Sequence, residues 1–165
     1  MLSRPIELHA ALPLASTAAR ESLLRVMRGI SSTSSTDRLA LAVYLGDLHV
    51  AVQGEIRVPV EVSVDDRPVR WEYAIAIRAA SDEGFFPTFA GTLSITPVGT
   101  QSELWLQGSY QAPFGMIGAL LDRTVLRHAA HRSLQSFLQR VADDTVAGER
   151  ATEAKHAQDV RGFHG

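Results

Sequence analysis

A run of alternating segments between Leu39 and Tyr110 constrains the fold more than any other feature of the sequence. In residues 56–64, one face would carry Ile56, Val58, Val60, Val62 and Val64, and the other Arg57, Glu61 and Ser63. The same alternation recurs in residues 69–78, 89–97 and 103–110. A period of two predicts strands with one buried face and one solvated face. The short connections favour hairpins over crossovers, so we expect an antiparallel meander.

Two elements are predicted before the meander. Residues 5–10 alternate Ile6 and Leu8 with polar side chains, which indicates a short half-buried strand. Residues 15–30 have capping residues at the start and apolar residues at helical spacing, which predicts one modest helix. The serine- and threonine-rich residues 31–37 are expected to form a loop.

The apolar face of such a sheet must be covered, and the segment from Pro113 to about Val141 is the later element able to do so. It contains no further proline, and no glycine follows Gly118 until Gly148. As a helix it would span about 40 Å. We therefore expect an α+β domain over residues 5–142, in which a curved antiparallel sheet wraps around a long C-terminal helix. Residues 143–165 are polar and are expected to form a flexible tail.

Two glycines at the start of this helix, Gly115 and Gly118, raise the question of a phosphate-binding loop. Such a loop needs a lysine with serine or threonine, or a GxGxxG motif after a parallel strand, and the sequence offers neither. We interpret the glycines as a joint that lets the helix backbone approach the sheet closely.

The apolar stripe of the long helix is interrupted by polar residues. Its early part is Ile117, Leu120, Leu121 and Val125, and its late part is Leu134, Phe137, Leu138 and Val141. Thr124, His128 and His131 lie between them and would continue the same face. This pattern is typical of a helix that packs at its ends and spans a cavity at its centre. Hydrogen-bonded core residues or exposed residues would give the same pattern.

Composition excludes several function classes. A net charge of −2 and a pI near 6.3 provide no broad basic surface, so we expect no nucleic-acid partner. No apolar run approaches the length of a membrane span, and the absence of cysteine fits a reducing cytoplasm. His128 and His131 have the spacing of two metal ligands but lack a third, so no metal and no cofactor is expected.

The order of elements and residues 85–142, FFPTFAGTLSITPVGTQSELWLQGSYQAPFGMIGALLDRTVLRHAAHRSLQSFLQRVA, resemble the START-like (SRPBCC) superfamily. The sequence is similar to the closing hairpin and helix of many bacterial members, and the likeness extends over residues 5–142. Members usually have two short helices after the first strand, whereas one is found here. The resemblance implies the helix-grip fold and a deep pocket for a hydrophobic or amphipathic small molecule.

The residues placed in that pocket are Trp71, Tyr73, Phe89, Tyr110, Thr124, His128 and His131. The aromatic side chains would form its wall, and the three helix residues would supply polar groups. Two alternatives remain open: a polyketide cyclase or dehydratase using a cavity histidine as acid or base, and a non-catalytic interaction module with a filled core.

Overall fold

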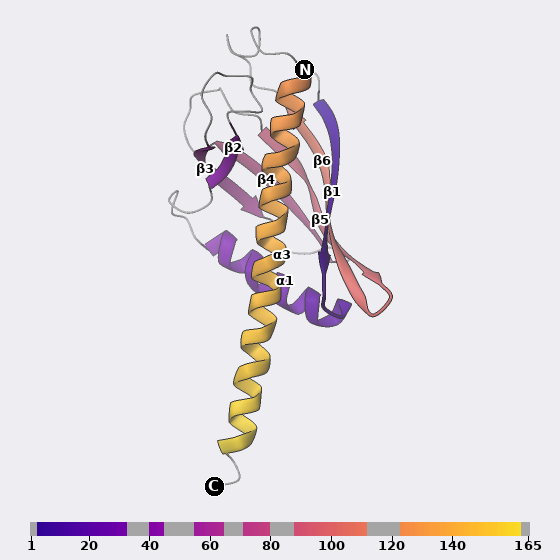
Figure 1. Cartoon of the computed structure of the whole chain (residues 1–165), viewed down its shortest axis with the longest axis vertical. Coiled ribbons are helices and arrows are strands. Elements are labelled where there is room, and N and C mark those ends of the chain that lie inside the picture. Colours follow the sequence, from indigo (N-terminus) through magenta and orange to yellow (C-terminus); the bar gives the residue numbers. More distant parts are fainter. Residues whose placement is uncertain are drawn as a thin grey trace.

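The strands form a single curved sheet, shown in Figure 1. The computed structural model describes residues 3–32, 40–44, 55–64, 71–79, 88–111 and 123–162, and the elements below belong to these ranges. The strands are β1 (Ser3–Leu12), β2 (Ala40–Tyr44), β3 (Glu55–Val64), β4 (Glu72–Ala79), β5 (Thr88–Val98) and β6 (Gln101–Gln111). Their order in the sheet is β1-β6-β5-β4-β3-β2, and each neighbouring pair is antiparallel. The predicted meander is confirmed, and β1 completes the sheet beside β6.

Two helices are described, α1 (Ser16–Ser32) and α3 (Arg123–Gly162). The long helix α3 contacts both β1 and β2, which are the two edge strands of the sheet. One straight helix can reach both edges only if the sheet curves around it, as Figure 1 shows. The expected α+β arrangement, a curved antiparallel sheet gripping a C-terminal helix, is therefore the observed one. The predicted glycine joint at residues 115–118 lies outside the described residues.

Helix α1 crosses α3 at one end of the concave face of the sheet (Figure 1). At the crossing, the Ser22 hydroxyl donates a 2.7 Å hydrogen bond to the Thr145 carbonyl oxygen. Beside it, the Arg25 guanidinium lies 3.0 Å from a carboxylate oxygen of Glu149. These contacts join residues more than a hundred positions apart. They hold α1 against α3, so that α1 closes this end of the space between α3 and the sheet.

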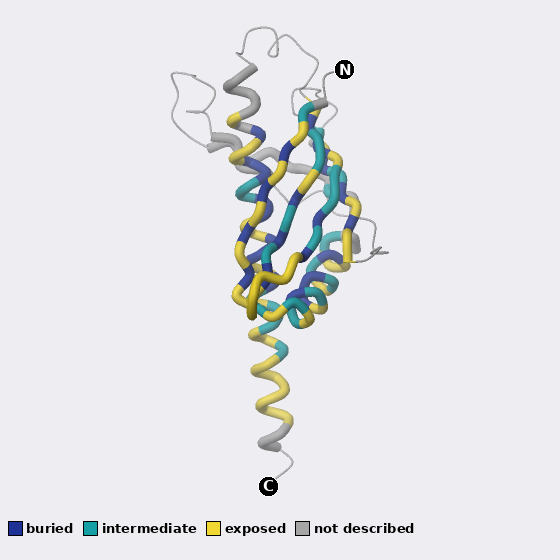
Figure 2. Tube along the Cα trace, turned by 90° about the vertical axis from the view of Figure 1, so that its right-hand side faces the viewer, coloured by how far each residue is buried: buried dark blue, intermediate teal, exposed yellow. Residues whose placement is uncertain are grey.

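The core lies between the concave face, α1 and α3. Alternate residues of each strand point into it, as period-two strands require. The buried apolar side chains of β1 and β4–β6 are Ile6, Leu8, Ala10, Leu12, Tyr73, Ile75, Ile77, Phe89, Leu93, Ile95, Leu104, Leu106 and Tyr110. Those of the two helices are Ala19, Leu23, Met27, Ala130, Leu134, Phe137, Leu138, Val141 and Ala142. In Figure 2 buried residues alternate with exposed or half-buried residues along the strands.

Residues 143–162 are helical and belong to α3, although the sequence predicts a flexible polar tail there. Thr145 is fully buried, so packing continues past the expected boundary at residue 142 and includes the crossing with α1. The segment has no proline, and it contains four alanines together with glutamate, arginine and lysine, all of which propagate a helix. Beyond Arg150 the side chains are mostly exposed, and α3 extends away from the sheet (Figures 1 and 2).

The exposed part of α3 is polar, and the buried part belongs to the core. Among the residues that the structure describes, no helix combines the length and the apolar character that a membrane span requires.

Candidate functional site

Three of the predicted pocket residues lie on the concave face of the sheet. Tyr73, Phe89 and Tyr110 are each at most 3% exposed. Phe89 and Tyr110 are opposite one another on β5 and β6, whereas Tyr73 is opposite Leu93. Tyr73 therefore lies two rows nearer than Phe89 to the end of the sheet that α1 closes. A ligand wall and a filled core would both place aromatic side chains here.

Two glycines separate these aromatic rows. Gly91 on β5 and Gly108 on β6 are partners across the ladder, on the same face as Phe89. A Cβ on Gly91 would lie 2.7 Å from the tip of the Phe89 ring, and one on Gly108 would lie 2.8 Å from it. The Phe89 ring thus lies over the space that two missing side chains leave free. The glycine pair also lets the two strands approach closely, because each added Cβ would overlap the main chain of the other strand.

Tyr73 has a buried hydroxyl with no hydrogen-bond partner among the described residues. Burial removes water from around the phenol and raises its pKa, and the nearby Arg28 guanidinium partly opposes this shift. A buried hydroxyl without a partner is uncommon in folded proteins and invites an explanation. A bound molecule with a hydrogen-bond acceptor would provide one.

Trp71 does not lie in the core, contrary to the sequence prediction. It occupies a turn just before β4, with φ of 68° and an exposed fraction of 40%. The sequence pattern predicts alternation through Trp71, Tyr73 and Ile75. In the structure the strand starts at Glu72, so Trp71 lies outside it. A positive φ breaks the alternation of side chains, which is why the indole leaves the face that Tyr73 occupies. Bulky residues rarely adopt this conformation, and such strain is often found at functional sites.

The exposed indole contacts α1 instead. The guanidinium carbon of Arg20 lies 5.5 Å from the centre of the Trp71 ring, a cation–π contact. Arg20 Nε is buried and has no hydrogen-bond acceptor among the described residues. Arg28 lies two helical turns further along α1 and is the cation that acts on Tyr73. We refer to Arg20, Arg28, Trp71 and Tyr73 as the basic–aromatic cluster.

Sequence reasoning missed the two arginines of this cluster. Arg20 and Arg28 are eight residues apart, so they lie about 80° from each other around α1, on the same side of the buried stripe that contains Leu23 and Met27. That spacing is the one signal in the sequence. It does not reveal which part of the sheet these arginines face, because this depends on how α1 packs against the strands.

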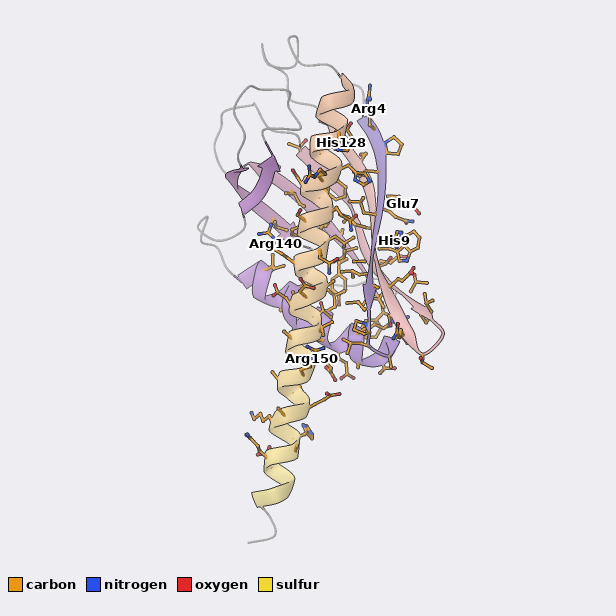
Figure 3. The ribbon with its side chains drawn as sticks, viewed as in Figure 1. Arg4, Glu7, His9, His128, Arg140 and Arg150 are labelled. Atoms are coloured by element: carbon orange, nitrogen blue, oxygen red, sulfur yellow. The ribbon has the colours of Figure 1, made fainter. Side chains whose placement is uncertain are left out.

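The two histidines of α3 are exposed, contrary to the expectation that they line a cavity. At about 100° per residue, His128 lies roughly 120° around the helix from Leu134, which is in the middle of the buried stripe. His131 lies about 60° from Leu134, at the edge of the stripe. The stripe passes instead through Ala130 and Ser133. Figure 3 shows His128 near the amino-terminal end of the described part of α3.

The remaining predicted pocket residue, Thr124, is within α3, but its side chain lies outside the described part of the structure. No group of three or more histidine, aspartate or glutamate side chains that could hold a metal ion occurs in the described ranges. The chemistry available at the described site is therefore that of phenols, guanidinium groups and aromatic rings.

Comparison with solved structures identifies the fold. The chain is similar to a conserved protein from Geobacillus kaustophilus, with 14% identity, a TM-score of 0.53 and coverage of 87% of this chain and 96% of the other. It is also similar to the ZhuI aromatase/cyclase from Streptomyces sp. R1128, with 11% identity, a TM-score of 0.51 and coverage of 87% and 94%. A third similar structure is that of Ara h 8.0201, with 9% identity, a TM-score of 0.51 and coverage of 91% and 99%.

These likenesses extend over nearly the whole length of both chains, so they concern the complete fold. At such low identities they show the fold alone. The resemblance to START-like proteins is thereby confirmed at the level of the helix-grip fold. A scan against protein-family models finds no match, and no curated protein matches the sequence.

Proposed function

We propose that the chain binds a hydrophobic or amphipathic small molecule between the concave face of the sheet and α3. The observation that carries this proposal is the grip itself: both edge strands contact α3, so the helix and the curved sheet enclose the face bearing Tyr73, Phe89 and Tyr110. Sites of this kind combine an apolar and aromatic wall with a few polar groups. The unpartnered hydroxyl of Tyr73 is such a group.

The alternative was a cyclase or dehydratase that uses a cavity histidine. Neither candidate histidine is in a position to act in this way. His128 and His131 are both exposed, and an acid or base must come within hydrogen-bond reach of the substrate. The likeness to an aromatase/cyclase concerns the fold and supplies no catalytic group. We therefore propose binding, and an interaction module with a filled core becomes the outcome that would contradict it.

Two measurements test the proposal. Native mass spectrometry of the protein isolated from its own cells is expected to show a co-purifying small molecule. Titration with the apolar dye 1-anilinonaphthalene-8-sulfonate, followed by dye fluorescence, is expected to show saturable binding. If neither a bound molecule nor saturable dye binding is found, the filled-core interpretation is correct.

A pair of matched variants locates the site. Ala130 is 4% exposed and faces the core from α3, whereas its neighbour His131 is exposed. Ala130→Leu adds volume between α3 and the sheet and is expected to weaken dye binding at least fivefold. His131→Leu introduces the same side chain on the surface and is expected to leave the affinity unchanged. Circular dichroism checks that both variants fold, because added volume in a packed core can cost about 1–3 kcal/mol. Equal effects of the two variants would place the dye elsewhere.

A further inference from the structure

We propose that the basic–aromatic cluster, where α1 meets the turn before β4, binds the carboxylate of an amphipathic ligand, with Arg20 and Arg28 as its cations and the Tyr73 hydroxyl as a further donor. This inference rests on the proposed function and specifies the class of ligand: a molecule with an apolar body and an acidic end.

The first step concerns the charges of α1. Arg25, on the flank that faces α3, is paired with Glu149 at 3.0 Å. Arg20 and Arg28 are not paired in this way, because in the described ranges neither forms a salt bridge with a carboxylate. These two guanidinium groups therefore lack the kind of partner that Arg25 has in Glu149. An incoming anion would supply it.

The second step concerns hydrogen-bond donors. Arg20 Nε and the Tyr73 hydroxyl are both shielded from solvent, and neither has an acceptor among the described residues. Both groups can donate, and a guanidinium can only donate. A carboxylate offers two oxygens that accept several hydrogen bonds, and charge-assisted bonds to arginine are among the strongest in proteins. One chemical group on the ligand would thus satisfy two otherwise costly groups.

The third step concerns access. Arg28 and Trp71 are exposed, Arg20 is half-buried and Tyr73 is 1% exposed, so the cluster leads from the surface into the core. Tyr73 is next to Ile75 on the concave face, in the direction where an apolar body would lie. Arg20 and Arg28 are about 12 Å apart along the helix axis, a span that two long flexible side chains can close around one headgroup.

The fourth step concerns the strained tryptophan. The Trp71 ring lies against the Arg20 guanidinium, which restricts that side chain and orients its remaining N–H groups. The positive φ of Trp71 is what turns the indole toward α1 and away from the core. Holding a cation in place before the ligand arrives reduces the entropy lost on binding.

The fluorescence of the Trp71 indole provides a measure of ligand binding. The chain has two tryptophans, Trp71 and Trp105. Trp105 is on the other face of the sheet, where it stacks on His9 with ring centres 5.2 Å apart. Figure 3 shows His9 and Glu7 projecting from β1 away from α3. Trp105→Phe therefore leaves Trp71 as the sole indole without touching the cluster, and its fluorescence reports on binding beside Arg20.

The experiment compares two probes with the same apolar chain length, one ending in an anionic carboxylate and the other in a neutral hydroxyl. The Trp105→Phe protein is titrated at pH 8 with dodecanoate and with 1-dodecanol, both below their aggregation limits. We expect dodecanoate to bind about tenfold more tightly or better, because the charge-assisted hydrogen bonds exist only for the acid. Raising the ionic strength is expected to reduce this preference at the exposed end of the cluster.

Matched variants assign the preference to the cluster. Arg28→Gln and Arg20→Gln are expected to lower the affinity for dodecanoate severalfold each and to leave that for dodecanol unchanged. Arg25→Gln removes the same charge from the position that is already paired with Glu149 and is expected to keep the preference. Tyr73→Phe is expected to weaken binding of the acid alone. Because Arg28 is exposed, its variant is expected to fold even if the Arg20 variant does not.

The outcomes separate the inference from the proposed function. The inference is overturned if the acid and the alcohol bind with equal affinity. It is also overturned if Arg25→Gln and Arg28→Gln have equal effects. Either result leaves apolar ligand binding intact. Absence of binding by both probes, together with absence of dye binding, would contradict the proposed function and the subsite with it.

Discussion

The Ser22 hydroxyl and the Thr145 carbonyl oxygen are joined by a 2.7 Å hydrogen bond between α1 and α3, and Gly148 makes room for it. A Cβ at position 148 would lie 2.9 Å from Ser22 Oγ, closer than ordinary packing allows. The Thr145 side chain turns the other way and donates to the Val141 carbonyl oxygen of its own helix. The crossing is therefore close because one small residue on each helix permits it.

This contact predicts a coupling between Ser22 and Gly148. Ser22→Ala should lower the free energy of unfolding by about 1 kcal/mol through loss of a buried hydrogen bond. Gly148→Ala should change it little, since a helix-propensity gain of about 1 kcal/mol offsets the displaced hydroxyl. In the Ser22→Ala background, the same glycine substitution should stabilise by nearly the full ~1 kcal/mol. Urea unfolding of the four proteins measures this cycle, and strict additivity would contradict the close contact.

The glycine pair of β5 and β6 predicts a large loss of stability on substitution. Gly91→Ala or Gly108→Ala places a Cβ against the Phe89 ring and the main chain of the opposite strand. We expect each variant to lower the free energy of unfolding by more than about 2 kcal/mol, in the range of overpacked cores. Phe89→Ala should not rescue either variant, because the main-chain overlap remains.

The control for these variants is Gly29→Ala in α1, where an added Cβ meets nothing within 4 Å. The same chemical change should there stabilise by up to about 1 kcal/mol, since alanine favours a helix over glycine. Thermal unfolding of the three proteins makes the comparison. If Gly91→Ala behaves like Gly29→Ala, the close approach of β5 and β6 is wrong.

Local patterns predicted most of the elements, because alternation and helical spacing are properties of neighbouring residues. The alternation predicted which residues of β4, β5 and β6 lie on the concave face. It failed at Trp71, because no sequence pattern indicates the positive φ of that residue. The histidines of α3 were misplaced because a helix face was extrapolated through polar residues, where a small angular error moves a side chain to the surface. The sequence did not predict a role for Arg20 and Arg28, because charged side chains at the side of a helix are ordinarily solvated.

The length of α3 predicts different effects for two truncations. Residues after Arg150 are mostly exposed, so a chain ending at Arg150 should keep the melting temperature of the full chain within a few degrees. A chain ending at Ala142 loses Thr145 and Glu149, and with them the contacts to Ser22 and Arg25. We expect that truncation to lower the free energy of unfolding by more than about 2 kcal/mol. Calorimetry of both chains checks this, and equal stability would restore a domain boundary at residue 142.

The buried phenol of Tyr73 predicts a loss of stability at alkaline pH. Its pKa in the folded protein is raised above the ordinary value of 10.0, so the folded state holds the proton more firmly than the unfolded chain. Its contribution is therefore complete below pH 10 and is lost as the pH rises from 10 through the raised pKa. Tyr73→Phe removes the ionisable group and should flatten this part of the stability profile. At pH 7 it should be neutral or slightly stabilising, within about 1 kcal/mol, because the hydroxyl it removes has no partner.

Urea unfolding of wild type and Tyr73→Phe at pH 7, 9 and 10.5 measures the difference. Tyr110→Phe removes a phenol from the same face and serves as the control for the loss of a buried hydroxyl there. A titration of tyrosine absorbance near 295 nm should show a phenol that ionises above pH 10 in wild type and is missing in Tyr73→Phe. A marked loss of stability at pH 7 in Tyr73→Phe would mean that the hydroxyl already has a protein partner. It would remove the donor on which the carboxylate subsite depends.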